Sequence, residues 1–305
     1  MNSKFKCGFV SIIGRPNVGK STLINHLIGQ KVAITSAKPQ TTRTNMKGVL
    51  TTEKGQIIFI DTPGLHKPHH LLGEKLVKSA IDSLNDIEVI LFLVDGTSEV
   101  GGGDRYIVEN ILKNVDKTPV YLLINKIDKI NKREREKFLA DYSSLYDFKK
   151  VFLISAKHGD NLENLTNDVF DLLPEGTAHY DEEYVTDTPM RDVAGELIRE
   201  QIFRLFGEEI PHSTAIFVDS YQDDYETNLT TIRATIYVER NSQKGIVIGK
   251  GATKLKEIGK NARLEIEKMI GNKVFLELHV KVLKNWRKDE KELEKLGYII
   301  GENLK

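Results

Sequence analysis

Several features that would mark a specialised class of protein are scarce in this sequence. One cysteine, Cys7, occurs among 305 residues, which excludes an internal disulfide and favours a reducing compartment over secretion. The longest unbroken apolar run is Val89–Val94, far short of the ~20 residues that a membrane-spanning helix needs. Neither sign of charge is in excess, because basic and acidic residues both number 44. With 40% hydrophobic residues, the chain has the composition of an ordinary folded protein, and its length suits about two domains.

The neutral total hides an uneven distribution of charge. Residues 175–190 contain five acidic side chains and no lysine or arginine, whereas residues 241–305 contain 15 basic side chains against 9 acidic ones. An acidic stretch before a basic region is typical of a solvated linker that leads to a polyanion-binding module. Ordinary surface variation would give the same numbers, so charge alone does not decide between these interpretations.

The first 174 residues alternate apolar strands with amphipathic helical stretches, which predicts an α/β domain with a mainly parallel sheet. Strands are expected at 9–13, 47–51, 56–61, 89–95, 120–125 and 151–155, and helices at 21–28, 71–84, 105–114, 133–145 and 162–173. Residues 53–55 predict a hairpin turn with Gly55 at positive φ. The domain is expected to occupy 1–174 and an acidic linker 175–190.

The remaining residues predict a second, α+β domain over 191–288, followed by a C-terminal helical tail over 289–305. An amphipathic helix is expected at 191–206, strands at 213–221 and 229–239, a short apolar piece at 246–248, a helix at 253–270 and a strand at 274–283. The resulting order is α-β-β-α-α-β.

A phosphate-binding loop follows the first predicted strand. Residues 14–21, Gly-Arg-Pro-Asn-Val-Gly-Lys-Ser, match the pattern G-x-x-x-x-G-K-[ST] and open a helix. In such a loop the backbone N–H groups surround a phosphate, Lys20 reaches the β- and γ-phosphates, and the Ser21 hydroxyl suits Mg²⁺. A plain glycine-rich turn is the alternative, which the strand–loop–helix context disfavours. The nucleotide-binding residues expected here are Gly14, Arg15, Pro16, Asn17, Val18, Gly19, Lys20, Ser21 and Thr22.

Three further motifs follow later strands in the order that a guanine-nucleotide switch requires. They are Asp61-Thr62-Pro63-Gly64, which has the pattern D-x-x-G, then Asn125-Lys126-Ile127-Asp128, and then Ser155-Ala156-Lys157. Asp61 is expected to hold Mg²⁺ through water, and the Gly64 N–H to sense the γ-phosphate. The Asp128 carboxylate can accept from N1 and the 2-amino group of guanine, two donors that adenine lacks, which argues against an ATPase. The Ala156 N–H is expected to bond the guanine O6. The expected nucleotide-binding residues of these motifs are Asp61, Thr62, Pro63, Gly64, Leu65, Asn125, Lys126, Asp128, Ser155, Ala156 and Lys157.

Together these motifs resemble the Era/Der-like GTPases of the TRAFAC class, and the second domain narrows the resemblance to the Era family, over about residues 5–290. Residues 40–43, Gln-Thr-Thr-Arg, match the switch I element of that group. The resemblance implies that Thr42, rather than Thr41, joins Ser21 and Asp61 around Mg²⁺ when GTP is bound. A polar exposed loop is the plain alternative.

The position after D-x-x-G departs from the pattern of many small GTPases, which carry a glutamine there to orient the attacking water. Here it is Leu65, so slow intrinsic hydrolysis is expected unless another group supplies positive charge. The resemblance implies that Asn17 coordinates K⁺ for this purpose, with Arg43 as a competing candidate. The catalytic residues expected on these grounds are Asn17, Lys20, Thr42 and Gly64.

Three histidines and the single cysteine are residue types that can bind metals or undergo redox chemistry, but their sequence context favours neither role. His66, His69 and His70 are expected to be solvated residues of the mobile switch II loop rather than metal ligands. Cys7 has no histidine in a recognisable arrangement and is expected to be buried filler.

The second domain resembles a type II KH domain, an RNA-binding fold in which a G-x-x-G loop clamps a single-stranded backbone beside an apolar groove. Here the loop is residues 249–252, with alanine at the second glycine position, a change that is expected to loosen the clamp without abolishing it. The expected groove residues are Ile246, Val247, Ile248, Leu255 and Ile258. The expected RNA-binding residues are Lys244, Ile248, Gly249, Lys250, Gly251, Ala252, Lys254 and Lys256. An ordinary amphipathic helix pair is the alternative.

The resemblance implies a function as a monomeric, Mg²⁺-dependent GTPase that cycles between GTP and GDP. It implies binding to the 3′ end of 16S rRNA and a role in assembly and maturation of the 30S ribosomal subunit. It also implies a cytoplasmic location with peripheral attachment to the inner membrane. Two alternatives stay open. In one, GTP only tunes RNA affinity and its turnover is incidental, as Leu65 would favour. In the other, the GTPase acts on a membrane or tRNA partner.

Overall fold

The computed structural model describes residues 5–35, 42–43, 45–65, 68, 71–115, 117–207 and 209–298. By their internal contacts these residues form two compact units. Unit 1 comprises Met1–Ala33, Thr42–His69 and Leu76–Asp187, and unit 2 comprises Thr188–Lys305 with the short stretches Ile34–Thr41 and His70–Lys75. Across the described ranges, no helix combines the length and apolar character needed to cross a membrane.

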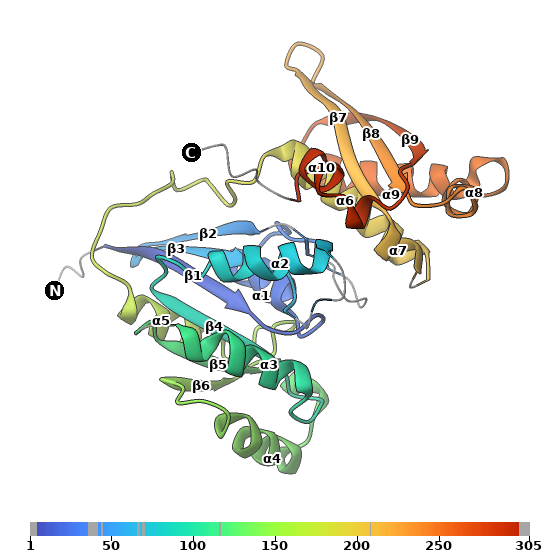
Figure 1. Ribbon diagram of the computed structural model, residues 1–305. Coiled ribbons are helices and arrows are strands. Elements are labelled where there is room, and N and C mark those ends of the chain that lie inside the picture. The colour runs from blue at the N-terminus through green and yellow to red at the C-terminus, as the bar shows by residue number, and fades with distance from the viewer. Residues whose placement is uncertain are drawn as a thin grey trace. The chain divides into compact units, whose positions relative to one another are not determined.

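Unit 1 is built on a six-stranded sheet in the order β2-β3-β1-β4-β5-β6 (Figure 1). The strands are β1 (Lys6–Ile13), β2 (Met46–Thr52), β3 (Gly55–Asp61), β4 (Val89–Asp95), β5 (Val120–Asn125) and β6 (Lys150–Leu153). All neighbouring strands run parallel except β2 and β3, which form an antiparallel hairpin. Gly55 follows the turn with φ at 155°. The mainly parallel sheet and the hairpin are therefore confirmed.

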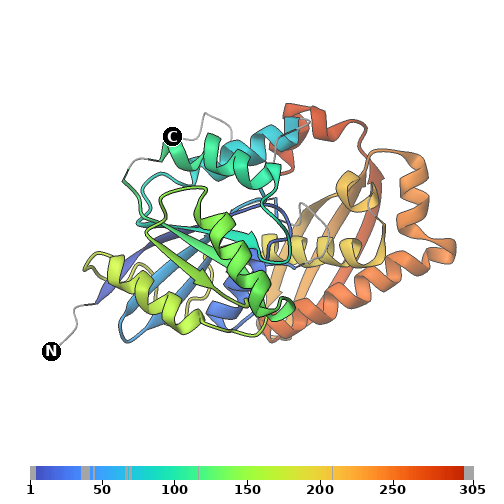
Figure 2. The same ribbon diagram turned by 90° about the horizontal axis from the view of Figure 1, so that it is seen from below.

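Helices cover both faces of this sheet, which explains why β4 and β5 are apolar along nearly their whole length (Figures 1 and 2). One face packs against α1 (Lys20–Ile28) and α5 (Leu162–Leu172). The other packs against α2 (Leu71–Asp82), α3 (Gly102–Asn110) and α4 (Lys132–Ser143). A 3-10 turn, Leu112–Asn114, replaces the end of the longer helix that the sequence predicts at 105–114.

Gln56 anchors residues 175–187, called the strap below, to β3. The Gln56 side chain is fully buried, and its Oε1 accepts hydrogen bonds from the backbone N–H groups of His179 at 2.9 Å and Tyr180 at 3.0 Å. Its Nε2 donates to the Tyr180 carbonyl oxygen at 2.9 Å. A buried glutamine near the start of β3 thus satisfies the backbone of a segment far along the chain.

Strand β2 holds the rest of the strap. The Val49 N–H donates to the Val185 carbonyl oxygen at 2.9 Å, and Lys47 pairs with the Asp187 carboxylate at 2.9 Å. Most of residues 175–187 are exposed, as a solvated segment would be, but they are also bonded to β2 and β3, and their acidic composition gives no sign of these contacts. Unit 1 extends to Asp187 rather than ending at residue 174.

Unit 2 has a three-stranded sheet in the order β7-β8-β9, in which β7 and β8 are antiparallel and β8 and β9 parallel. Its strands are β7 (Ala215–Asp224), β8 (Leu229–Val238) and β9 (Lys273–Val282). Its helices are α6 (Met190–Leu205), α7 (Glu209–Ser213), α8 (Asn241–Ile248), α9 (Thr253–Ile270) and α10 (Glu290–Lys295). The helix α6 packs on β7 and α9 on β9 (Figure 1). The predicted order is confirmed, with α7 as a short addition, and α10 lies within the region predicted to be a C-terminal helical tail.

Candidate nucleotide and RNA sites

The loop between β1 and α1 surrounds the side chain of Lys20. Its Nζ donates to the carbonyl oxygens of Gly14 at 3.2 Å and Arg15 at 3.1 Å. Burial of this ammonium group lowers the pKa of Lys20 to about 8. Gly19 adopts φ of 109°, and a Cβ there would lie 2.4 Å from the Asn125 Nδ2, so only glycine fits. The arrangement places a lysine and the start of a helix together, as a phosphate site requires.

Three hydroxyl and carboxylate oxygens converge next to this lysine. The Ser21 Oγ lies 2.7 Å from the Asp61 Oδ2 and 3.2 Å from the Thr42 Oγ1, and the Thr42 Oγ1 lies 3.3 Å from the Asp61 Oδ2. Neighbouring oxygens of an octahedral Mg²⁺ site are about 3.0 Å apart, because each Mg–O distance is ~2.1 Å. The Ser21–Thr42 spacing therefore fits two neighbouring Mg²⁺ ligands, and Asp61, predicted to act through water, lies within hydrogen-bond distance of both hydroxyls. Thr41 lies outside the described residues.

Asn125 joins the phosphate loop to the loop after β6. Its Nδ2 donates to the Val18 carbonyl oxygen at 2.8 Å, and its Oδ1 accepts from the Ala156 N–H at 2.9 Å. The side chain is buried, so its role here is to brace the two loops. The predicted bond from Ala156 to the guanine O6 therefore requires this N–H to be shared or exchanged.

The carboxylate of Asp128 is oriented by a neighbouring hydroxyl. Its Oδ1 accepts from the Ser155 Oγ at 2.7 Å, and this hydrogen bond holds the pKa of Asp128 below its usual value. The side chain keeps 19% of its surface exposed, so an ionised oxygen is available to a ligand. This is the state that guanine recognition needs.

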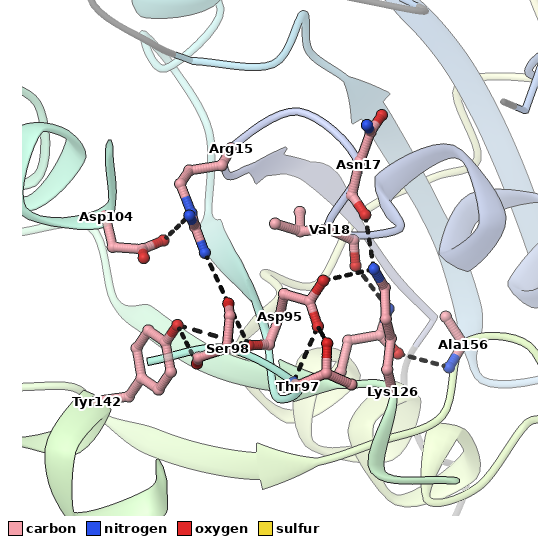
Figure 3. Close-up of polar contacts among 11 residues, drawn as sticks. Arg15, Asn17, Val18, Asp95, Thr97, Ser98, Asp104, Lys126, Tyr142 and Ala156 are labelled. Carbon is pink, nitrogen blue, oxygen red and sulfur yellow. Dashed lines mark hydrogen bonds and ion pairs between the residues drawn. The ribbon is translucent and has the colours of Figure 1, made fainter. Parts of the chain in front are cut away.

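Lys126 links the phosphate loop to the end of β4 (Figure 3). Its Nζ donates to the Asn17 carbonyl oxygen at 2.9 Å and to the Asp95 Oδ2 at 2.5 Å. Burial alone would raise the pKa of Asp95, but the hydrogen bonds from Lys126 and Thr97 lower it overall. The sequence interpretation missed Asp95, although its place at the carboxyl end of a buried strand was a usable signal.

The D-x-x-G segment lies directly against the phosphate loop. A Cβ on Gly64 would be 2.8 Å from the Pro16 Cα, and the Leu65 N–H donates to the Gly14 carbonyl oxygen at 3.0 Å. The Leu65 side chain is fully buried in the core beneath α2. Thr62 donates from its hydroxyl to the Ile12 carbonyl oxygen at 2.7 Å.

The other predicted residues of unit 1 vary in exposure. Arg43 and Pro63 are buried, Thr22 is half-buried and Lys157 is exposed. Gln40, His66, His69 and His70 lie outside the described residues. In the rest of the chain, as far as the structure describes it, no group of three or more His, Cys, Asp or Glu residues could hold a metal ion. Cys7 is buried, as expected.

The predicted RNA loop joins α8 to α9 and turns through left-handed backbone. Gly249, Gly251 and Ala252 have φ of 72°, 60° and 61°. The alanine therefore adopts the conformation that a second glycine would take freely, at a cost of about 1–2 kcal/mol. Lys250 is exposed at the tip of the loop.

The predicted apolar groove is only partly present. Val247 and Ile258 are fully buried in the core of unit 2, so their assignment to the groove is wrong. Each is an apolar residue on an amphipathic helix, which suits either a groove or a core, and the packing of α8 and α9 against the sheet selects the core. Ile246 is 50% exposed and remains available to a ligand. Among the predicted lysines, Lys254 forms an ion pair with Glu257 at 2.9 Å. Lys244, Ile248 and Leu255 are half-buried and Lys256 is exposed.

Comparison with known proteins gives a match for each unit and for the chain over nearly its whole length. Residues 9–126 match a family model described as a 50S ribosome-binding GTPase, and residues 209–287 match a KH domain model. GTPase Era of Lactobacillus helveticus is 50% identical over 295 residues, which cover 97% of this chain and 97% of that protein. This chain belongs to the Era family of GTPases.

Two Era crystal structures resemble the chain over its length, each with a TM-score of 0.92 and 39% identity, covering 97% of this chain and all of theirs. One is a variant of Aquifex aeolicus Era bound to GDP·AlF4−. The other is Era in complex with MgGDPNP and nucleotides 1506–1542 of 16S ribosomal RNA. The P-loop GTPase fold followed by a KH domain, expected from the sequence, is confirmed by these Era structures.

Proposed function

We propose that this chain is a GTP-hydrolysing switch that binds the 3′ end of 16S rRNA and assists assembly and maturation of the small ribosomal subunit. The observation that carries the proposal is the convergence of Ser21, Thr42 and Asp61 beside the buried Lys20, in a chain that also has a KH domain. The Era complex with MgGDPNP and 16S rRNA supports the choice of nucleotide, metal and RNA.

The proposal assigns the nucleotide to residues of the phosphate loop and of the loops after β5 and β6. Lys20 binds the β- and γ-phosphates, Asp128 orients guanine, and Asn125 keeps the two loops at a fixed spacing. Ser21 and Thr42 hold Mg²⁺ with Asp61, and Thr42 joins the site from switch I, so GTP binding orders that segment. The metal supplies positive charge to the phosphate oxygens when it is bound. The four residues proposed to act in hydrolysis remain Asn17, Lys20, Thr42 and Gly64.

The RNA is bound at the loop between α8 and α9. The positive φ values of Gly249 and Gly251 let a sugar–phosphate backbone approach the chain closely, and Lys250 adds charge at the tip. Ile246 offers an exposed apolar contact to a base. A double variant, Lys250→Glu with Lys256→Glu, tests this surface. It should lose affinity for the 16S oligonucleotide while GTP turnover without RNA is unchanged.

The description of the GTPase family model names the 50S subunit, whereas the Era complex contains RNA of the small subunit. The GTPase family model matches only residues 9–126, whereas the Era structure matches 97% of this chain, including the KH domain. The small subunit is therefore the better-supported partner. Binding assays with separated 30S and 50S subunits distinguish the two.

The buried Leu65 favours a second candidate function, in which GTP only tunes RNA affinity. A fully buried leucine cannot orient a water molecule, so nothing at this position accelerates hydrolysis. Single-turnover hydrolysis in the presence of RNA, compared between K⁺ and Na⁺ buffers, tests it. Turnover too slow for a working cycle in both salts supports the tuning function. Acceleration by K⁺ supports a role for Asn17, and loss of turnover in Arg43→Lys in either salt would favour Arg43.

The remaining alternative is a membrane or tRNA partner docked on unit 2. It predicts that the Lys250→Glu and Lys256→Glu changes leave RNA affinity unaltered. For location, we propose the cytoplasm with peripheral attachment to the cytoplasmic face of the membrane. A single buried cysteine suits a reducing compartment. Fractionation of cells before and after a high-salt wash tests the attachment.

Coupling between nucleotide and RNA is proposed to pass through the strap. The strap is bonded to β2 and β3, which follow switch I and precede the D-x-x-G motif, respectively. Two residues separate its last contact, Asp187, from the start of α6 at Met190. A Gly-Ser insertion between Thr188 and Pro189 should reduce the effect of nucleotide on RNA affinity. An unchanged effect would exclude the strap as the route.

A further inference from the structure

The sequence contains a glycine run that none of the nucleotide motifs explains. Gly101-Gly102-Gly103-Asp104 forms the N-cap and first turn of α3, after the loop that follows β4. Asp104 is fully buried, and its Oδ2 accepts from the Gly101 N–H at 2.9 Å, which caps the helix. Its other oxygen faces the phosphate loop.

The partner of that oxygen is Arg15, the second residue of the phosphate loop (Figure 3). The Arg15 Nε and the Asp104 Oδ1 form an ion pair at 2.8 Å, and an Arg15 terminal nitrogen donates to the Ser98 Oγ at 3.1 Å. Burial raises the pKa of the Asp104 carboxyl, and the Gly101 N–H and the Arg15 guanidinium offset part of that rise. A buried carboxylate that lost this cation would be strongly destabilised, so the pair is held together.

Two of the glycines make room for the arginine, and the third does not. A Cβ on Gly103 would lie 2.7 Å from the Arg15 Cδ, and one on Gly101 would lie 3.0 Å from an Arg15 terminal nitrogen. A Cβ on Gly102 would meet nothing within 4 Å. Gly101 and Gly103 therefore leave the space that the Arg15 side chain occupies. Gly102, which lies between them and faces no neighbour, is a control position for substitution.

A second contact fixes the same short segment from its other end. Lys126 donates to the Asn17 carbonyl oxygen, and Asp95, at the start of the β4–α3 loop, holds Lys126. Ser98 lies in the same loop, and its carbonyl oxygen accepts from the Tyr142 hydroxyl at 3.1 Å. Residues 15–17 are thus anchored at both ends to one loop, which α4 supports in turn.

The anchored segment is the part of the phosphate loop that faces the D-x-x-G glycine. Pro16 lies between the two anchors, and a Cβ on Gly64 would be 2.8 Å from its Cα. The Gly64 side of the loop is where the γ-phosphate is sensed, whereas GDP is held mainly by the later N–H groups and Lys20. Movement of residues 15–17 would therefore disturb the GTP complex more than the GDP complex.

We propose that Arg15 and Asp104 are positioning residues for GTP hydrolysis, which fix the bend of the phosphate loop opposite Gly64. The inference rests on the proposed function, because it assumes that this site hydrolyses GTP. Neither side chain touches the reacting atoms. They act by holding the backbone of residues 15–17, which carries Asn17 and lies against Gly64, and small displacements at such a site are costly in rate.

The matched variants Gly103→Ala and Gly102→Ala test this assignment. Both add one methyl group in the first turn of α3 and remove the same backbone freedom, but only the first meets Arg15. Gly103→Ala should lower kcat by about tenfold with GDP affinity changed less than about threefold. Gly102→Ala should match the wild type. Equal kcat for the two variants, in protein with equal melting temperature, would overturn the proposal.

A second pair keeps the test decisive if Gly103→Ala folds poorly. Asp104→Asn preserves the oxygen that caps Gly101 and removes the charge that holds Arg15, so kcat should fall while KM changes little. Glu99→Gln removes a neighbouring exposed ion pair with Lys137 and should have no effect. A fall in kcat only in proportion to lost folded protein would contradict a positioning role. Wild-type protein without GTPase activity would instead remove the proposed function.

Discussion

The backbone N–H of Leu65 donates to the carbonyl oxygen of Gly14 at 3.0 Å, and the Leu65 side chain is fully buried. The residue that follows D-x-x-G is therefore part of the core beneath the phosphate loop. In GTPases with a glutamine at this position the side chain serves the attacking water. Here the same position stabilises the contact between the two phosphate-sensing segments, so the attacking water must be oriented, or hydrolysis otherwise accelerated, by another group.

Leu65→Gln should therefore fail to accelerate hydrolysis. An amide placed in this apolar cluster loses its hydrogen bonds to water, and we expect the free energy of unfolding to fall by about 2–4 kcal/mol. Urea unfolding and GTP turnover on the same preparation measure both effects. Faster turnover at unchanged stability would show that the side chain can reach the water and that its burial is not fixed.

Thr42→Ala should weaken Mg²⁺-dependent binding of a GTP analogue but leave GDP binding nearly unchanged. The reason is that Thr42 contributes a third oxygen near Ser21 and Asp61 from the switch I side. Thr42→Ser is the matched control, since it keeps the hydroxyl and should bind the analogue like the wild type. Titration of Mg²⁺ against fluorescent nucleotides reads out the difference. Identical curves for all three proteins would exclude Thr42 from the site.

Ala252→Gly should stabilise unit 2 by about 1 kcal/mol, because glycine adopts φ of 61° without the steric cost that alanine has. Ala252→Val should destabilise it, since a β-branched side chain is still less compatible with left-handed backbone. Chemical denaturation followed by the fluorescence of Trp286, which is buried in unit 2, measures both. Opposite signs for the two variants are expected, and equal losses would contradict the argument.

Gln56→Leu should release the strap from unit 1. The change leaves the His179 and Tyr180 N–H groups without their acceptor, at a cost of about 1–3 kcal/mol for each group that stays buried. We expect faster hydrogen exchange confined to residues 175–187. Asp187→Asn is the comparison variant, because it weakens a half-exposed ion pair with Lys47 and should have a smaller effect. Unchanged exchange in Gln56→Leu would mean that other contacts hold the strap.

The phosphate loop and most strands of this protein could be predicted from the sequence, because the patterns that indicate them are local. The phosphate loop needs glycines and a lysine at fixed spacing, and buried parallel strands need continuous apolar runs, so both could be placed within a few residues. The strap and the Arg15–Asp104 pair were not predictable in this way. Both join residues far apart in the chain, and neither a lone glutamine in a strand nor an acidic stretch indicates its partner.

In the KH domain, too, the sequence identifies residues whose conformation and burial it does not predict. The sequence identifies the loop and its alanine, but only the backbone shows that Ala252 takes the left-handed conformation. Likewise, the apolar side chains of Val247 on α8 and Ile258 on α9 are compatible with a groove or a core. Packing against the sheet decides for the core, and that information is tertiary.

The most direct test of the account is the affinity of the protein for an oligonucleotide of the 16S rRNA 3′ end, measured with GDPNP and with GDP. A switch that couples nucleotide to RNA predicts at least about fivefold tighter binding with GDPNP, the lower end of ordinary coupling energies. It also predicts that the Gly-Ser insertion after Thr188 reduces the difference in RNA affinity between the GDPNP and GDP states. Equal affinity in both nucleotide states would contradict the switch, and no binding in either state would contradict the RNA target.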